Sequence, residues 1–173
     1  MKYANYYHPE RVGNASFLKV DKHHTYNPTI TNRSLKAAFL KKGVELNNPD
    51  VNEGRNIAFN LYHDGQKIHA KNSGQNYLIA TENPLICPYN RDLKYLQQFK
   101  FVFTWNTDLI HLPNVIPLFI PNKIKHREFE EFKDRPIFSC IINANKAFPQ
   151  GVSGDLYKER INVIRWYEKY FPD

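Results

Sequence analysis

The sequence is poor in cysteine and in long apolar runs, and each shortage excludes a class of protein. Its two cysteines, Cys87 and Cys140, lie far apart in apolar surroundings, so we expect reduced, buried thiols and neither a disulfide nor a metal site. The longest apolar run, 115–120, is interrupted by Pro117 and falls far short of the roughly 20 apolar residues that cross a bilayer. The first residues lack the apolar stretch of a signal peptide, which favours a cytoplasmic protein.

Signature motifs for nucleotides and nucleic acids are also missing. Neither a Walker sequence nor Gly-x-Gly-x-x-Gly occurs, so any phosphate is held by a less stereotyped site. No zinc-finger or RNA-recognition signature occurs, and the 24 Lys and Arg residues are scattered, with no run of four basic side chains. The net charge of +7 first predicts a solvated basic surface, and it also suits a phosphorylated small molecule, an anionic membrane face or nucleic acid.

Short apolar segments separated by polar turns indicate a parallel α/β sheet of the Rossmann-like kind. The chain has 173 residues and is 42% hydrophobic, which suits one domain or one domain plus part of another. Strands are expected at residues 44–46, 57–62, 77–81, 100–105 and 116–119. Their alternation with helical segments favours parallel pairing.

Two helices are expected in the same part of the chain, one before the first of these strands and one between the third and the fourth. The first runs over 34–42, with Thr31 or Asn32 as its N-cap and Gly43 after its end. The second runs over 91–98 and is capped by Asn90. Residues 1–29 have no clear period, and the segments 8–10 and 26–28 are expected to form turns.

The pattern changes after residue 124, where we expect the first domain to end. Residues 125–135 are very polar and are expected to form a linker. A strand at 136–142, a polar turn and a helix at 154–170 then follow, and this succession builds phosphate sites in α/β proteins. A parallel strand needs a later strand to which its crossover helix returns. We therefore expect 136–173 to begin a second Rossmann-like domain without completing it.

Three polar turns follow predicted strands and supply the candidate site residues. In open parallel sheets ligands bind beyond the carboxyl ends of the strands, which is where these turns lie. The candidates are Glu82 and Asn83 in the first turn, Asn106 and Asp108 in the second, and Asn143, Asn145 and Lys146 in the third.

Glu82 is the candidate general base. It follows an apolar strand and precedes Asn83-Pro84, which stops the chain from continuing as a helix. A half-buried carboxylate in this place is suited to accept a proton from a substrate. The alternative is that Glu82 pairs with an arginine or caps the following turn.

Arg160 is the candidate anion-binding residue. It lies near the start of the last helix, where a guanidinium and the helix N-terminus together suit a diphosphate, and Lys146 in the preceding loop is a second candidate. The alternative is a surface ion pair of Arg160 with Glu159 or Asp155.

The segments 77–84 (Tyr-Leu-Ile-Ala-Thr-Glu-Asn-Pro), 99–109, 141–146 and 155–168 together resemble the bacterial fucosyltransferase-type (family 10) glycosyltransferases. The likeness extends from about residue 34 to the end and is best in the last 35 residues. It implies a GT-B enzyme, in which an N-terminal Rossmann-like half holds the acceptor glycan and a C-terminal half holds a nucleotide sugar such as GDP-fucose. It also implies transfer with inversion, in polysaccharide or lipopolysaccharide synthesis, without a metal or another cofactor.

The resemblance assigns roles to individual residues. Glu82 matches the family's general base in a Gly-Glu-Asn motif, although Thr81 stands where the family has Gly. Arg160 matches an arginine that contacts the nucleotide diphosphate, with Asn143, Asn145 and Lys146 in the preceding loop. The family continues beyond this point, so we expect the chain to transfer poorly or not at all by itself.

Two other functions fit the sequence. A non-catalytic glycan-binding module would keep the acceptor-side fold and need no nucleotide. A nucleic-acid binder would account for the net charge of +7, but the scattered basic residues and the missing motifs argue against it. We therefore expect a nucleotide sugar and a glycan as partners, no nucleic acid, and at most peripheral contact with the inner face of a membrane.

Overall fold

A computed structural model describes residues 1–9, 12–18, 30–69, 75–119, 132–134 and 156–171. The chain divides into two compact units, residues 1–122 and 123–173, and the division falls close to the expected end of the first domain at residue 124. Each unit is described by itself below.

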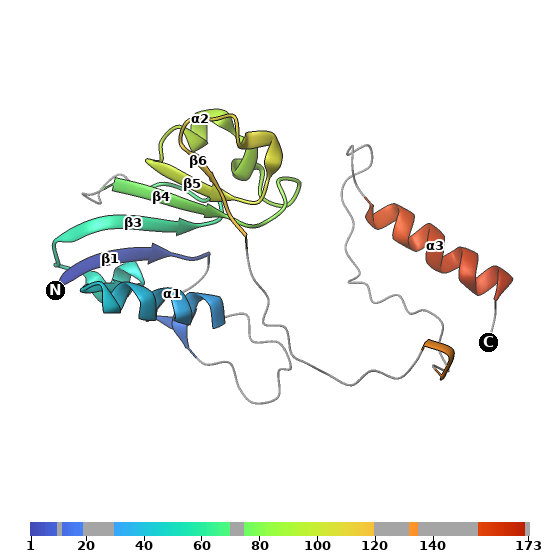
Figure 1. Cartoon of the computed structure of the whole chain (residues 1–173), viewed down its shortest axis with the longest axis horizontal. Helices are drawn as coiled ribbons and strands as arrows, with labels where there is room; N and C mark the ends of the chain where they lie inside the picture. The colour runs from blue at the N-terminus through green and yellow to red at the C-terminus, as the bar shows by residue number, and fades with distance from the viewer. Residues whose placement is uncertain (10–11, 19–29, 70–74, 120–131, 135–155, 172–173) are drawn as a thin grey trace. The chain divides into compact units, whose positions relative to one another are not determined.

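The first unit is built on one sheet of six strands, all of which pair in parallel (Figure 1). The spatial order is β2-β1-β3-β4-β5-β6. The strands are β1 (Lys2–Tyr7), β2 (Val44–Asn47), β3 (Ile57–His63), β4 (Gln75–Ala80), β5 (Phe101–Thr104) and β6 (Val115–Pro117). The Rossmann-like parallel α/β fold expected from the sequence is thus confirmed for this unit.

The connections contain two α-helices and several short 3₁₀ turns. The α-helices are α1 (Ile30–Lys41) and α2 (Leu93–Leu96). The 3₁₀ turns are η1 (Ala15–Phe17), η2 (Pro49–Asn52), η3 (Pro88–Arg91) and η4 (Thr107–Leu109).

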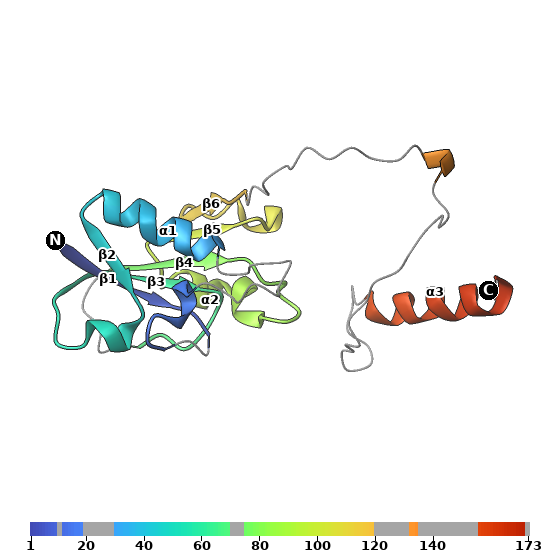
Figure 2. The same ribbon diagram turned by 90° about the horizontal axis from the view of Figure 1, so that it is seen from below.

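Each face of the sheet has its own apolar core because successive side chains of a strand point to opposite faces. Tyr6 packs with Leu46 and Leu61 in a cluster that includes residues of α1. Its neighbour Tyr7 belongs to the other cluster, which includes Leu96 of α2. Figure 2 shows α1 and α2 on opposite sides of the strands. The connections after β1 and after β4 therefore cover different faces of the sheet.

Five predicted strands are confirmed, with ends shifted by a few residues, and a sixth strand lies in residues 1–29, where the sequence shows no clear period. That segment contains β1, which pairs with both β2 and β3 inside the sheet. Its sequence, Lys-Tyr-Ala-Asn-Tyr-Tyr, has polar and aromatic residues where a buried parallel strand usually has a continuous aliphatic run. Tyr6 and Tyr7 are nevertheless buried, because tyrosine fills the core positions of this strand.

The helix boundaries also need correction. The first helix begins at Ile30, so the expected N-caps Thr31 and Asn32 lie inside it, whereas Gly43 follows its end with a φ of 76° as expected. The expected helix 91–98 is only the short α2, and Asp92 caps it by accepting hydrogen bonds from the backbone of the next turn. Asn90 does not cap it, because its side chain binds the loops after β3 and β4.

An asparagine ladder crosses the sheet on the α2 face. We use this name for Asn47 of β2, Asn52 of η2, Asn5 of β1, Asn60 of β3 and Asn76 of β4. Each side-chain amide donates to the next amide oxygen in this order, over distances of 3.0–3.1 Å. Asn5 is the register partner of both Asn47 and Asn60, and Asn60 is the register partner of Asn76. The ladder therefore fixes the register of four neighbouring strands.

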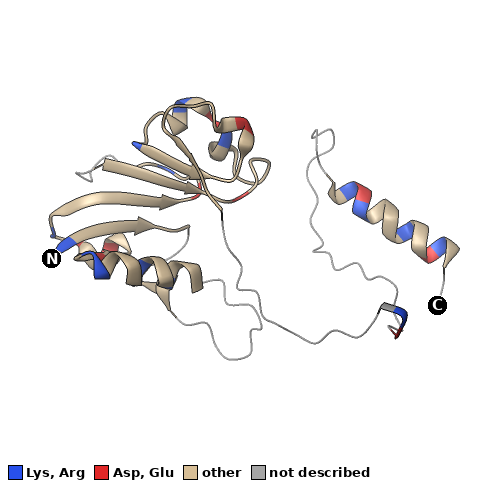
Figure 3. Cartoon of the chain, in the orientation of Figure 1, with Lys and Arg blue, Asp and Glu red and all other residues tan. Residues whose placement is uncertain are grey.

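The second unit is described only for η5 (Phe132–Asp134) and α3 (Tyr157–Tyr170). The helix expected at 154–170 is thereby confirmed over nearly all of its length. Basic and acidic residues both occur near each end of α3, in agreement with the scattered charge of the sequence (Figure 3). The expected strand at 136–142 and most of the expected linker at 125–135 lie outside the described residues.

We predict that Asn60→Ala destabilises the first unit by about 2–4 kcal/mol, because it leaves the amide of Asn5 without its acceptor and that of Asn76 without its donor. Urea unfolding of both proteins measures the change. Asn56→Ala, at an exposed position next to β3, is the matched control and should change the free energy of unfolding by less than about 0.5 kcal/mol. Equal stability of the two variants would contradict a structural role for the ladder.

Candidate functional site

A cluster of polar side chains lies at the carboxyl ends of β1, β3 and β4. The strand order runs from β3 to β1 and then to β2, so β1 and β3 are neighbours whose connections lead in different directions. Phe17, in the connection after β1, packs on the α1 face, whereas Ile68, after β3, packs on the α2 face. Such a divergence is a topological switch point, the usual place for ligands in open parallel sheets.

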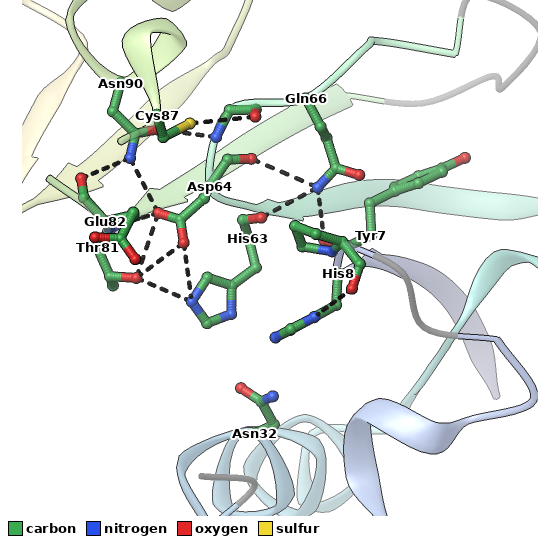
Figure 4. A network of polar contacts seen from close by, with 12 residues as sticks. Tyr7, His8, Asn32, His63, Asp64, Gln66, Thr81, Glu82, Cys87 and Asn90 are labelled. Carbon is green, nitrogen blue, oxygen red and sulfur yellow. Dashed lines mark hydrogen bonds and ion pairs between the residues drawn. The ribbon is translucent and has the colours of Figure 1, made fainter. Parts of the chain in front are cut away.

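Asp64, the residue after β3, organises this edge of the sheet (Figure 4). Its Oδ1 accepts hydrogen bonds from the backbone N–H of Thr81 (2.7 Å), the backbone N–H of Glu82 (2.8 Å) and the side-chain amide of Asn90 (3.0 Å). One carboxylate thus holds the end of β4 and the start of η3 against the end of β3.

The backbone around Asp64 is adapted to this role. Asp64 has a φ of 58°, a left-handed conformation that aspartate and asparagine tolerate better than most residues. Gly65 follows, and a Cβ on it would lie 2.1 Å from Cβ of Tyr89, so only glycine fits. Its backbone N–H donates to Oδ1 of Asn90 at 2.8 Å. The turn after β3 therefore packs tightly on η3.

Gln66 ties β1 to β3 where the strands end. Its side-chain amide donates to the backbone oxygen of Tyr7 at 3.2 Å and to that of His63 at 3.1 Å (Figure 4). These bonds satisfy carbonyl groups that the sheet leaves unpaired at the point where its two strands separate.

His63, the last residue of β3, lies in a chain of hydrogen bonds. The amide of Asn32 donates to the backbone oxygen of Ser16, and its Oδ1 accepts the hydroxyl of Tyr6 at 2.8 Å. The hydroxyl of Tyr6 also lies within hydrogen-bond distance of Nδ1 of His63. On the other side of the ring, Nε2 lies 3.0 Å from the hydroxyl of Thr81, which itself donates to Asp64.

Burial controls the charge of His63. Desolvation lowers the pKa of His63, His8 lowers it further, and Asp64, whose Oδ2 is 3.7 Å from Nε2, opposes the shift. The rings of His8 and His63 meet edge to face with centroids 4.9 Å apart. Burial also raises the pKa of Tyr6 far above its usual value, with the charge of Asp64 as a second cause. Both groups of this pair are therefore neutral near pH 7.

Glu82 lies at this edge, but its expected half-burial is wrong. The side chain is exposed, and its Oε1 accepts only the backbone N–H of Asn83 at 2.9 Å among the described residues. The backbone on both sides of the side chain is fixed, because the N–H of Glu82 binds Asp64 and its carbonyl oxygen accepts from Asn90 at 2.9 Å. The carboxylate thus stands on a rigid base and is open to solvent.

The other acceptor-side candidates are Asn83, Asn106 and Asp108. The side chain of Asn83 caps a turn by accepting the N–H of Leu85 at 2.8 Å. Asn106 caps η4 in the same way by accepting the N–H of Asp108 at 3.0 Å. Both asparagines thus have structural roles, whereas the exposed carboxylate of Asp108 accepts no hydrogen bond within the described ranges of the chain.

Of the residues expected to bind the donor, the structure describes only Arg160. It lies in the first turn of α3, with its guanidinium carbon 5.1 Å from the ring centre of Tyr157. Asn143, Asn145 and Lys146 lie outside the described residues.

Sequence reasoning missed His63 and Asp64, which form the centre of the cluster. Their signal was the succession His63-Asp64-Gly65 directly after a predicted strand, which has the same form as the turns that were selected. Tyr6 could not be found because its strand was not recognised. Cys87 is only partly buried, whereas the sequence predicted a buried thiol, and its Sγ donates to the backbone oxygen of Gly65 at 3.3 Å. Cys140 lies outside the described residues.

Compared with protein-family models, with curated proteins and with solved structures, the chain matches none. Across the described ranges, no group of three or more His, Cys, Asp and Glu side chains is placed to hold a metal ion. None of the helices in those ranges has the length and apolar character needed to span a membrane.

We predict that Asp64→Ala lowers the free energy of unfolding by about 2–4 kcal/mol, because three donors, two of them in partly buried hydrogen bonds, lose a charged acceptor and alanine is strained at positive φ. Asp64→Asn keeps an acceptor oxygen and tolerates the backbone, so it should cost about half as much. Urea unfolding distinguishes the two. An alanine variant as stable as the asparagine variant would remove Asp64 from this role.

We predict that acidification below about pH 6.5 destabilises the first unit through His63. The folded-state pKa of His63 is lowered, so in this range the unfolded chain binds a proton that the folded protein does not, and the free energy of unfolding decreases as the pH decreases. Thermal unfolding at pH 7.5 and 5.5 measures this slope. His63→Gln should flatten it, whereas His111→Gln, at an exposed position, should leave it unchanged. An equal slope in all three proteins would contradict the assignment.

Proposed function

We propose that the chain is part of an inverting glycosyltransferase that transfers a sugar, fucose-type from GDP-fucose, to a glycan acceptor. In this proposal the first unit is the acceptor half of a GT-B enzyme, and the second unit begins the donor half. The observation that carries the proposal is Glu82, an exposed carboxylate on a fixed backbone at the carboxyl edge of a parallel sheet.

The reaction needs one proton acceptor on the acceptor side. In the proposed step the Glu82 carboxylate takes the proton of an acceptor hydroxyl while that oxygen attacks the anomeric carbon of the donor sugar. The bond from this carbon to the diphosphate breaks, and the diphosphate leaves with the electron pair, so the configuration inverts. Arg160, Lys146, Asn143 and Asn145 are the proposed partners of the diphosphate, whose growing charge a guanidinium stabilises.

Rigidity of the Glu82 backbone supports this role. A general base works well only when its position relative to the reacting hydroxyl is fixed within a fraction of an ångström. Asp64 binds the N–H groups of Thr81 and Glu82, and Asn90 binds the carbonyl of Glu82. These contacts leave only side-chain rotations free, while the exposure of the carboxylate leaves room for a sugar.

The exposure of Glu82 also favours a second candidate, a glycan-binding module without transferase activity. An exposed carboxylate accepts hydrogen bonds from sugar hydroxyls whether or not a proton is transferred. This module would bind an oligosaccharide equally well in the presence and absence of a nucleotide sugar.

The test is calorimetric titration of GDP and GDP-fucose into the chain, with a transfer assay on the chain and on a version that carries a complete donor domain. We expect GDP-fucose to bind and to be consumed only when a glycan is present. If the extended protein ignores every nucleotide sugar, the transferase proposal fails, and oligosaccharide binding that persists would favour the module.

We predict that Glu82→Gln lowers turnover of the active protein at least about a hundredfold, because the amide cannot accept the proton. Glu53→Gln replaces another exposed carboxylate of the first unit and should leave turnover unchanged. Steady-state kinetics with GDP-fucose and a glycan measures both variants. Near-normal turnover of the Glu82 variant would remove this residue from the role of base.

A further inference from the structure

Trp105 is a large aromatic side chain that is fixed in place and yet exposed. It directly follows β5, and its indole N–H donates to the backbone oxygen of Thr81 at 2.7 Å. The residue is nevertheless 48% exposed. Among the described residues no other aromatic ring or cation packs on the indole. The hydrogen bond anchors one edge of the ring, and much of its surface stays open to solvent.

Trp105 is anchored next to the proposed base. The carbonyl of Thr81 that accepts its N–H is bonded directly to the nitrogen of Glu82. On the other side Asp108 lies in η4, which begins two residues after Trp105. The indole therefore stands on the same edge of the sheet as two exposed carboxylates, neither of which is used by another side chain of the described ranges.

The negative charges of Glu82 and Asp108 favour some of the ligands that can stack on tryptophan over others. A nucleobase stacks well on an indole, but its phosphates would be repelled by Glu82 and Asp108. Figure 3 shows acidic segments in the loops beyond β4 and β5, and the basic residues of the first connection, Arg91 and Lys94, lie further along it in η3 and α2. A neutral ligand with many hydroxyl groups fits this edge better, because carboxylates accept hydrogen bonds from hydroxyls.

We propose that Trp105 is the platform on which a pyranose ring of a neutral glycan stacks, with Glu82 and Asp108 as acceptors for its hydroxyl groups. The axial C–H groups of a pyranose carry a small positive charge and pack on the negative face of the indole. Hydroxyl groups at the rim of the ring are then free to reach the carboxylates. This inference rests on the proposed function for the identity of the glycan as acceptor, but glycan binding needs no nucleotide.

The test uses the fact that the chain has only two tryptophans, Trp105 and Trp166. In Trp166→Phe, Trp105 is the only indole fluorophore. Lactose, cellobiose and chitobiose are titrated without nucleotide, and sorbitol, a polyol without a ring, is the control ligand. We expect at least one disaccharide to shift the emission of Trp105 to the blue with a saturating curve, and sorbitol to have no effect.

Calorimetry on single variants of the full chain then measures how much Trp105 contributes to disaccharide affinity. Trp105→Ala should bind the active disaccharide about tenfold or more weakly, whereas Trp105→Phe keeps an aromatic face and should lose less. Trp166→Ala, on α3, should bind as the parent does. Circular dichroism confirms that each variant is folded.

Two results would overturn the platform. One is that no disaccharide shifts the emission of Trp105; the other is that Trp105→Ala binds as tightly as the parent. A larger effect of GDP than of any sugar on this emission would likewise contradict it. Transfer from GDP-fucose is measured separately, so loss of stacking with intact transfer refutes only the platform, and stacking without transfer refutes only the transferase.

Discussion

Buried asparagines constrain where the strands of the first unit end. Parallel strands are apolar on both faces, so apolar burial alone specifies their register weakly. The asparagine ladder removes this freedom, because a one-residue slip of β3 would turn Asn60 into the opposite core and leave Asn5 and Asn76 without partners. All of its amides donate in the same direction, an arrangement in which neighbouring hydrogen bonds strengthen one another. A strand that shifts its register therefore loses the hydrogen bonds of its ladder asparagine, and this loss of free energy favours the observed register.

Fixed register brings particular side chains to the same edge of the sheet. Because Asn60 is aligned with Asn5 and Asn76, His63 ends β3 beside the ends of β1 and β4. There Nδ1 of His63 contacts the hydroxyl of Tyr6, and Asp64 accepts hydrogen bonds from the backbone N–H groups of Thr81 and Glu82. The polar contacts of the site thus depend on the strand register that the asparagine ladder fixes inside the sheet.

Much of the fold, but only part of the site, could be predicted from the sequence. Apolar segments such as 77–81 predict strands, because the strands of a buried parallel sheet are rich in aliphatic residues. The strand Lys2–Tyr7 could not be recognised from the sequence, because tyrosine and asparagine occupy buried positions at which aliphatic residues are usual. Glu82 was placed at the right edge of the sheet but with the wrong burial, since exposure depends on how the following turn packs. Asp64 escaped notice because its partners are backbone groups 17 and 18 residues away, which no local pattern records.

The division of labour among the polar groups indicates which of them a ligand can use. The carboxylate of Asp64 is occupied by two backbone N–H groups, the hydroxyl of Thr81 and the amide of Asn90, so a ligand could displace these contacts only by loosening the end of β4. Glu82, Asp108 and the open surface of Trp105 make few or no such contacts within the described residues. Because the backbone that carries these side chains is already fixed, less conformational entropy is lost when a ligand binds to them. Recognition at this edge therefore falls to the exposed groups, and the partly buried His63 and Asp64 hold them in place.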